Sequence, residues 1–95
     1  MPVQLDQGNL VLEGECNIDT AEALREHLLS LLQQGQSPIV VKTEAMTTVD
    51  VSVLQVFLAA RVSLRQRGGQ LIIQSSPLLT RLLHDAGLPD AALFS

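Results

Sequence analysis

A hydroxyl and a carboxylate stand together at the predicted start of a helix in the middle of the chain. Asp50 and Ser52 lie in the stretch 46–69, which reads MTTVDVSVLQVFLAARVSLRQRGG and passes from small polar residues into an apolar helical pattern. Asp50 can accept a hydrogen bond from a free N–H group of the first turn, as N-cap residues do. Ser52 would then lie in that turn, where the free N–H groups and the positive end of the helix favour a negative group. The spacing therefore makes Ser52 a candidate acceptor for a phosphoryl group.

A protein-binding surface is expected around the same helix start, because hydroxyls and a carboxylate gather there. The predicted partner-binding residues are Thr47, Thr48, Asp50, Ser52 and Val53. Taken one by one, the two threonines are predicted to be turn residues and Asp50 to be a helix cap. The sequence thus predicts a partner that docks where this helix begins.

The chain carries no residue pattern typical of an enzyme. It shows no nucleophile–base pair with an orienting group, no metal-ligand spacing and no phosphate-binding glycine loop. His27 and His84 are far apart in the sequence, and neither has companion ligands. Gly68 and Gly69 follow a helix instead of preceding one, so they are not expected to cradle a phosphate. Cys16 is the one cysteine and is expected to be a buried thiol. We expect a non-enzyme without a metal or another cofactor.

Composition limits the classes of partner. The 95 residues suffice for one domain, residues 1–95, and with 46% hydrophobic but 2% aromatic residues its core must be aliphatic. The net charge of −4 argues against nucleic acid or an anionic membrane as the main partner. Arg61, Arg65 and Arg67 are expected on the solvated side of a helix, where they could contact an acidic partner. The lone thiol, the start MPVQLDQGN and the lack of a run of about 20 apolar residues predict a soluble cytoplasmic protein without membrane insertion.

Apolar periodicity and turn residues predict an α/β fold in the order β-β-α-β-α-β-α. The helices are expected over about 20–33, 53–66 and 77–86, and the strands over 3–6, 10–15, 39–42 and 70–74, while 93–94 could add a last short strand. Strands separated by helices pair in parallel, and the opening hairpin adds an antiparallel pair. The sequence therefore predicts a mixed sheet of four or five strands flanked by about three helices.

Helix starts are marked by capping residues. Asp19 stands three residues before Glu22, which predicts a variant of the capping box at the first helix. Ser76 followed by Pro77 predicts the start of the third, because serine caps well and proline suits the first helical position. Asp50 is predicted to cap the second helix, which places Ser52 in the first turn of that helix.

Four motifs, in register along essentially the whole chain, resemble those of STAS domains, the anti-sigma factor antagonists and their relatives. Residues 12–15 running into 19–21 resemble the "L-x-G-E-L-D…T-A" opening, and residues 48–54 resemble the phosphorylation loop, usually D-S-S-G-L. Residues 67–71 resemble the "G-G" entry to the next strand, and 76–88 resemble the "S-P-x-V-x-x-L-F…G-L" helix. The sequence is therefore similar to a STAS domain protein.

The resemblance implies a binding module in place of a catalyst. In such proteins a serine kinase phosphorylates the loop serine, a phosphatase removes the phosphate, and the charge decides whether the module binds its partner. By position the acceptor is Ser52, and Asp50 matches the loop aspartate. The partner implied is an anti-sigma factor or a serine kinase-type protein in a bacterial regulatory or chemosensory system.

Two positions depart from the usual loop. Val51 replaces the first hydroxyl, and Val53 replaces a glycine whose backbone a β-branched residue does not easily adopt. The second reading is an accessory STAS subunit of a phospholipid-transport ABC transporter, which would bind the transporter ATPase. Such subunits often keep threonine or serine where this chain has Val51. Both readings stay open at this point.

Overall fold

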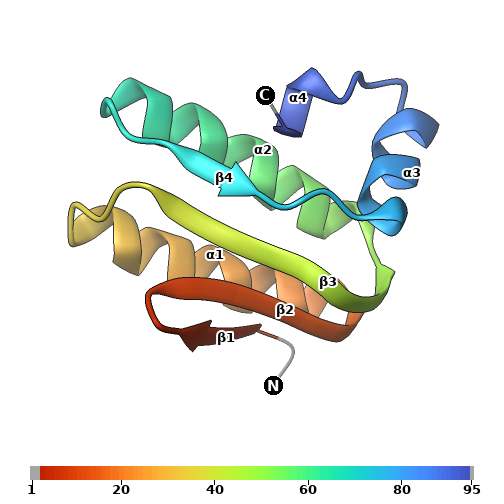
Figure 1. The fold of residues 1–95 in the computed structure, drawn as a ribbon, viewed down its shortest axis with the longest axis horizontal. Helices are drawn as coiled ribbons and strands as arrows, with labels where there is room; N and C mark the ends of the chain where they lie inside the picture. The colour runs from red at the N-terminus through yellow and green to blue at the C-terminus, as the bar shows by residue number, and fades with distance from the viewer. Residues whose placement is uncertain (1–2, 95) are drawn as a thin grey trace.

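A mixed four-stranded sheet, in the order β1-β2-β3-β4, carries the helices in the computed structural model, which describes residues 3–94 (Figure 1). The elements are β1 (Val3–Asp6), β2 (Asn9–Cys16), α1 (Ile18–Gln33), β3 (Ile39–Val49), α2 (Val51–Gln66), β4 (Leu71–Ile73), α3 (Pro77–Asp85) and α4 (Ala91–Phe94). The order confirms the α/β fold class and the mixed sheet that the sequence predicts. None of the helices within residues 3–94 is long and apolar enough to cross a membrane.

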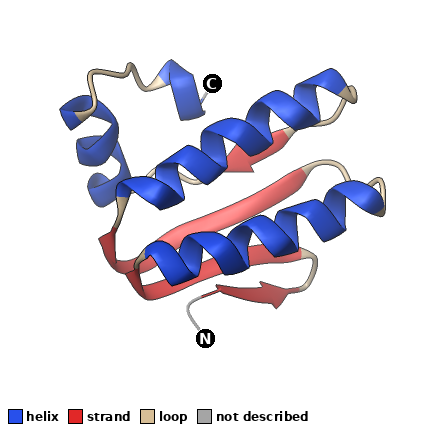
Figure 2. Cartoon of the chain, turned by 180° about the vertical axis from the view of Figure 1, so that it is seen from behind, coloured by secondary structure: helices blue, strands red, loops and turns tan. Residues whose placement is uncertain are grey.

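Two parallel crossovers place α1 and α2 on one face of the sheet. β1 runs antiparallel to β2, whereas β2, β3 and β4 run parallel to one another. Gln7 and Gly8, with φ of 51° and 85°, form the tight turn between β1 and β2. Figure 2 shows α1 and α2 side by side across the strands, with α4 on the far side of α2 and α3 near the start of α2, where it contacts β3. The starts of α1 and α2 therefore meet at the same end of the sheet.

The core lies between that face of the sheet and the helices. It is aliphatic, as the composition predicts, and its one fully buried aromatic side chain among the described residues is Phe57. Its fully enclosed members include Leu10, Leu12, Leu24, Ile39, Val41, Val53, Leu79 and Leu83. Burying such side chains is the main source of stability in a domain of this size. Val53 belongs to this set, so the residue that follows Ser52 anchors the start of α2 to the sheet.

The structure shows that the sequence predictions for two elements are wrong. β3 does not end near Lys42 but continues to Val49, because β2 pairs with it as far as Cys16↔Val49. Thr47 and Thr48 are therefore strand residues and not turn residues. Residues 93–94 form no strand: they belong to α4, where the buried Leu93 packs into the core. In both cases a contact distant in sequence decides the conformation.

The helix caps agree with the sequence at two of three positions. Ser76 accepts from the Leu79 N–H at the start of α3, and the Asp50 side chain caps α2. The cap of α1 is Asn17 and not Asp19, because the Asn17 side chain accepts from two backbone N–H groups and the Thr20 hydroxyl accepts from the Asn17 N–H. This capping box moves the helix start to Ile18, beside the start of α2.

Candidate functional site

The candidate site is built on the junction between β3 and α2. Asp50 has an extended backbone, with φ −90° and ψ 153°, and its N–H donates to the Cys16 carbonyl at 2.8 Å. That bond ties the junction to the end of β2. Asp50 Oδ2 accepts from the Ser52 N–H at 3.0 Å and from the Ser52 hydroxyl at 2.5 Å. The carboxylate thus both caps the helix and orients the hydroxyl.

The hydrogen bonds also set the charge state of the carboxylate. The Ser52 hydroxyl first, and the Ser52 N–H second, hold the pKa of Asp50 below its ordinary value, because both stabilise the charged form. A carboxylate with a lowered pKa is a weaker base. Asp50 is therefore favoured in its charged form, in which it accepts both hydrogen bonds from Ser52.

The other predicted site residues differ in their exposure. Thr47 and Thr48 are exposed and lie at a register shift between β2 and β3, where the regular alternation of side chains along a strand is interrupted. Val53 is 0% exposed and lies in the core. Its side chain cannot be part of an accessible surface, and its helical position also explains how valine replaces glycine there without backbone strain. Asp50 and Ser52 remain as the polar centre of the site.

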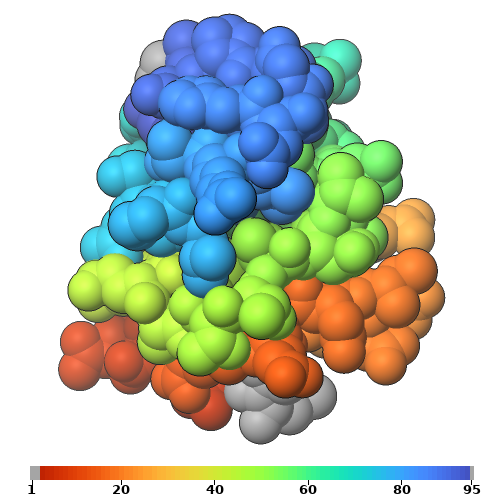
Figure 3. Space-filling model, turned by 90° about the vertical axis from the view of Figure 1, so that its right-hand side faces the viewer, coloured from red at the N-terminus to blue at the C-terminus, as the bar shows by residue number. Residues whose placement is uncertain are grey.

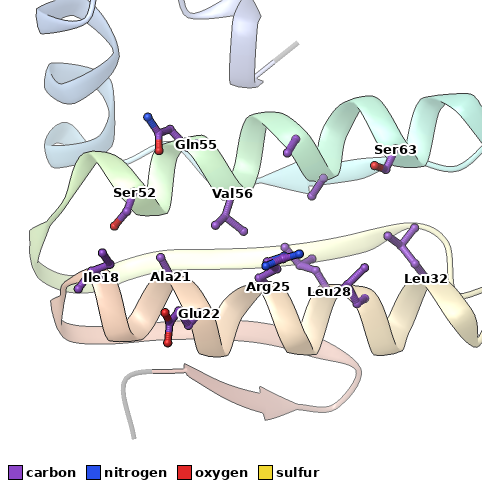
Figure 4. Close-up of a pocket in the computed structure, with 13 residues that line it drawn as sticks. Ile18, Ala21, Glu22, Arg25, Leu28, Leu32, Ser52, Gln55, Val56 and Ser63 are labelled. Atoms are coloured by element: carbon purple, nitrogen blue, oxygen red, sulfur yellow. The ribbon is translucent and has the colours of Figure 1, made fainter.

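Two apolar side chains that the sequence analysis did not single out flank this centre. Ile18 is 62% exposed at the start of α1, and Val51 is 47% exposed at the start of α2. In Figure 4 the Ser52 hydroxyl points toward Ile18 across the space between the two helices. Figure 3 shows this end of the molecule, with the α2 start in green above the α1 start in orange. The exposure of Ile18 could have been predicted from the sequence, because Ile18 lies outside the row of apolar residues that α1 directs into the core.

A groove of about 400 Å³ runs from Ser52 along the two helices. From α1 it is lined by long apolar side chains such as Leu29 and Leu32, and from α2 by short ones such as Ala59 and Ser63. The groove exists because these short side chains do not fill the space between the helices (Figure 4). Ser52 is thus one end of an apolar groove and not an isolated surface hydroxyl.

Arg61 corrects another expectation, since it does not lie on the solvated side of α2. It is 6% exposed, and its Nη1 donates to the Ala91 carbonyl at 2.9 Å. Burial, and secondarily the nearby Arg65, lower the pKa of Arg61. Arg65 and Arg67 are exposed as predicted. The buried guanidinium therefore joins α2 to α4, and no triple-arginine surface forms.

The remaining candidate residues stand apart from the groove. Cys16 is buried as predicted, and burial raises the pKa of its thiol. His84 Nε2 lies 2.8 Å from Asp90 Oδ1, and both side chains are exposed. Within residues 3–94, no three His, Cys, Asp or Glu side chains are grouped closely enough to hold a metal ion.

Comparisons with known proteins show the family and the fold of this chain. The family model described as "Mlab, STAS domain" matches residues 3–94. The solved structure of the Bacillus cell fate determinant SpoIIAA in its phosphorylated form is 21% identical, with a TM-score of 0.66, and the match covers 90% of this chain and 84% of that one. A structure of Mglu is 15% identical, with a TM-score of 0.56, and matches 79% of this chain but only 19% of that chain. No curated protein matches the sequence significantly. The two structures share the fold, and the family match confirms the STAS resemblance.

Proposed function

Because this chain belongs to the STAS family described as "Mlab, STAS domain", we propose that it is a protein-binding module whose binding is switched by phosphorylation of Ser52. It would relay a signal to an anti-sigma factor or serine kinase-type partner in a bacterial regulatory or chemosensory system. The module is proposed to bind and not to catalyse. SpoIIAA, which shares the fold, has a solved structure in its phosphorylated form.

One observation carries the proposal. The Ser52 hydroxyl is held by Asp50 at the start of α2, and exposed Ile18 and Val51 lie on either side. Exposed apolar side chains that lie beside polar groups mark protein-interaction sites. A modification at Ser52 would therefore lie inside the contact area of a docked partner.

The direction of the switch follows from charge and hydration. A phosphoserine carries about −1.5 to −2 charges at neutral pH. The free N–H groups at the start of α2 favour that charge, whereas Asp50 opposes it, so we expect little net change in fold stability. A partner that covers Ser52 would have to strip water from the phosphate next to apolar side chains, which is unfavourable. We propose that phosphorylation releases the partner.

A second candidate function is a constitutive subunit that binds the ATPase of a phospholipid-transport ABC transporter. The missing hydroxyl at Val51 counts against this reading, because such subunits often keep threonine or serine there; the observation in its favour is that Val51 is apolar and 47% exposed. An apolar side chain there suits a permanent interface better than a hydrated, switching one. Under this reading the Asp50–Ser52 hydrogen bond only caps the helix.

Phosphate mapping in the host cell distinguishes the two functions. Wild-type protein, Ser52→Ala and the control Ser63→Ala would be isolated from host cells and analysed by mass spectrometry for phosphopeptides. Ser63 is a matched control because it lies on the same groove and the same helix. We expect phosphate on wild type and Ser63→Ala and none on Ser52→Ala. Normal phosphate uptake by Ser52→Ala would exclude this acceptor.

Partner binding gives the second half of the test. Proteins that copurify with the wild type would be identified, and the affinity of the main partner would be measured by calorimetry for wild type, Ser52→Ala and Ser52→Asp. The switch predicts weaker binding of Ser52→Asp alone. Equal affinity of all three proteins for a transporter ATPase would support the constitutive subunit.

A further inference from the structure

Ser52 is surrounded by carboxylates. Asp50 accepts from the Ser52 N–H at 3.0 Å and from its hydroxyl at 2.5 Å. Asp19 and Glu22 are exposed near the start of the neighbouring helix α1. A phosphoryl group on Ser52 would replace the hydroxyl hydrogen that Asp50 accepts, and would add about −1.5 to −2 charges. A phosphate at this position would therefore be stabilised by a cation within its reach.

Arg25 is suited to be that cation. Within residues 3–94 it is the one basic side chain that lines the α1–α2 groove, and Ser52 lines the same groove. It is exposed, and in the described part of the chain its guanidinium has no ion pair and no hydrogen bond. Its planar fork of N–H donors matches the oxygens of a phosphate. Arg25 is thus free to bind a new anion in the groove.

The direction of a helical side chain brings Arg25 toward Ser52. Long side chains on a helix lean toward its N-terminus and cover the preceding turn. The residue one turn before Arg25 is Ala21, which also lines the groove and has a short side chain. In Figure 4 the guanidinium lies between the two helices, and the Ser52 hydroxyl points to the start of α1. Ala21 therefore leaves a path along which Arg25 can approach a phosphate on Ser52.

Glu22 competes with the phosphate for Arg25. It stands three residues before Arg25 on α1 and also lines the groove. The two side chains form no ion pair in the structure, and exposed pairs at this helical spacing are weak. A phosphate carries more charge than a carboxylate and has three acceptor oxygens for the guanidinium. Arg25 should therefore prefer phosphorylated Ser52 to Glu22.

We propose that Arg25 is the phosphate-binding residue of the switch and pairs with phosphorylated Ser52 across the start of the groove. The inference rests on the proposed function, because it names the residue of this chain that recognises the modification. The pair would tie α1 to α2 and hold a charged side chain over Ala21. A partner that covers Ser52 would have to break this pair or bury it, which adds to the cost of stripping water from the phosphate.

A protein with phosphoserine at position 52 tests the pair without a kinase. Phosphoserine would be incorporated during synthesis of the full chain, in otherwise wild-type protein and in the variants Arg25→Gln, Arg25→Lys and Arg65→Gln. Arg65→Gln is the matched control, because Arg65 is exposed in the last turn of α2, far from Ser52, and its loss changes the net charge equally. The second pKa of the phosphate would be measured by phosphorus NMR titration at low and high salt, and circular dichroism would verify the fold of each protein.

A cation beside the phosphate favours its doubly charged form, so the wild type should have a lower second pKa than Arg25→Gln. We expect the acid dissociation constant to be at least about threefold smaller in Arg25→Gln and partly restored in Arg25→Lys. Arg65→Gln should match the wild type, and high salt should reduce the differences. Equal constants for wild type and Arg25→Gln would overturn the proposal, since the N–H groups of α2 would then hold the phosphate alone. An equal change in Arg65→Gln would also overturn it, because net charge would then account for the effect.

These outcomes are separate from those of the phosphate mapping in host cells. The titration does not depend on a kinase, so a missing phosphate on Ser52 in cells would refute the switch and leave the measured pair unaffected. Conversely, equal dissociation constants for wild type and Arg25→Gln would refute the pair and leave Ser52 as the mapped acceptor.

Discussion

The two flanks of α2 differ in how they are covered. On one flank α3 and α4 close over the helix, and Leu83 and Leu93 there are 0% and 1% exposed. On the other flank α1 leaves a groove, and Ile18 and Leu29 beside it are 62% and 46% exposed. One flank of α2 is thus covered by α3 and α4, and the other flank borders an exposed groove.

The difference inverts the usual distribution of polarity. The closed flank contains a buried cation, Arg61, that donates to the Ala91 carbonyl, while the open flank leaves leucine and isoleucine in water. A buried charge is kept only where it is hydrogen-bonded, and exposed apolar patches mark interaction sites. We infer that the closed flank serves stability and the open flank serves binding.

The largest expected effect is on the closed flank. Leu83→Ala should lower the free energy of unfolding by about 2–5 kcal/mol, because it removes a fully buried side chain and leaves a cavity. Leu29→Ala, on the open flank, should change it by less than about 0.5 kcal/mol. Urea denaturation followed by circular dichroism measures both. Equal losses would mean that the open flank is also part of the stabilising core.

The second effect concerns the cation. Arg61→Met should lower the free energy of unfolding by about 1–3 kcal/mol, since it removes a charged hydrogen bond to the α4 backbone. The control is Arg65→Met, because Arg65 is exposed on the same helix and should have little effect. If Arg61→Met is as stable as wild type, packing alone holds α4 in place and the buried charge is dispensable.

Local chemistry could be predicted from the sequence wherever one segment decides the outcome. The Asp50 cap and the Ser76–Pro77 start are interactions within a few residues, so the residue types themselves specify them. Periodicity located three helices within a few residues of their ends. The Asp50–Ser52 part of the site was predicted for the same reason, because both residues sit in one helical turn.

Features set by contacts distant in sequence were missed. The length of β3 depends on pairing with β2, and the burial of Arg61 depends on a carbonyl thirty residues later. The groove depends on which side chains of α2 face α1, and their short lengths become informative only once the two helices are paired. Asn17 was not predicted as the N-cap of α1 because Asp19 and Glu22 also fit a capping pattern. The two candidate caps, Asn17 and Asp19, are only two residues apart.

The smallest expected effect tests the cap at the mouth of the open flank. Hydrogen bonds from Ser52 hold the pKa of Asp50 below its ordinary value of 3.8, so its charged form is favoured in the folded state. A depressed folded pKa gives stability that is present above the unfolded pKa and is lost as the pH falls through the folded one.

Asp50→Asn still caps the helix but does not titrate in this range. The stability of wild type relative to Asp50→Asn should therefore be constant well above the ordinary pKa of 3.8 and decrease as the pH falls below it. Urea titrations of both proteins at a series of pH values measure this difference, which cancels the titration of the shared carboxylates. A difference that does not change with pH would mean that the Asp50–Ser52 hydrogen bonds do not favour the charged carboxylate.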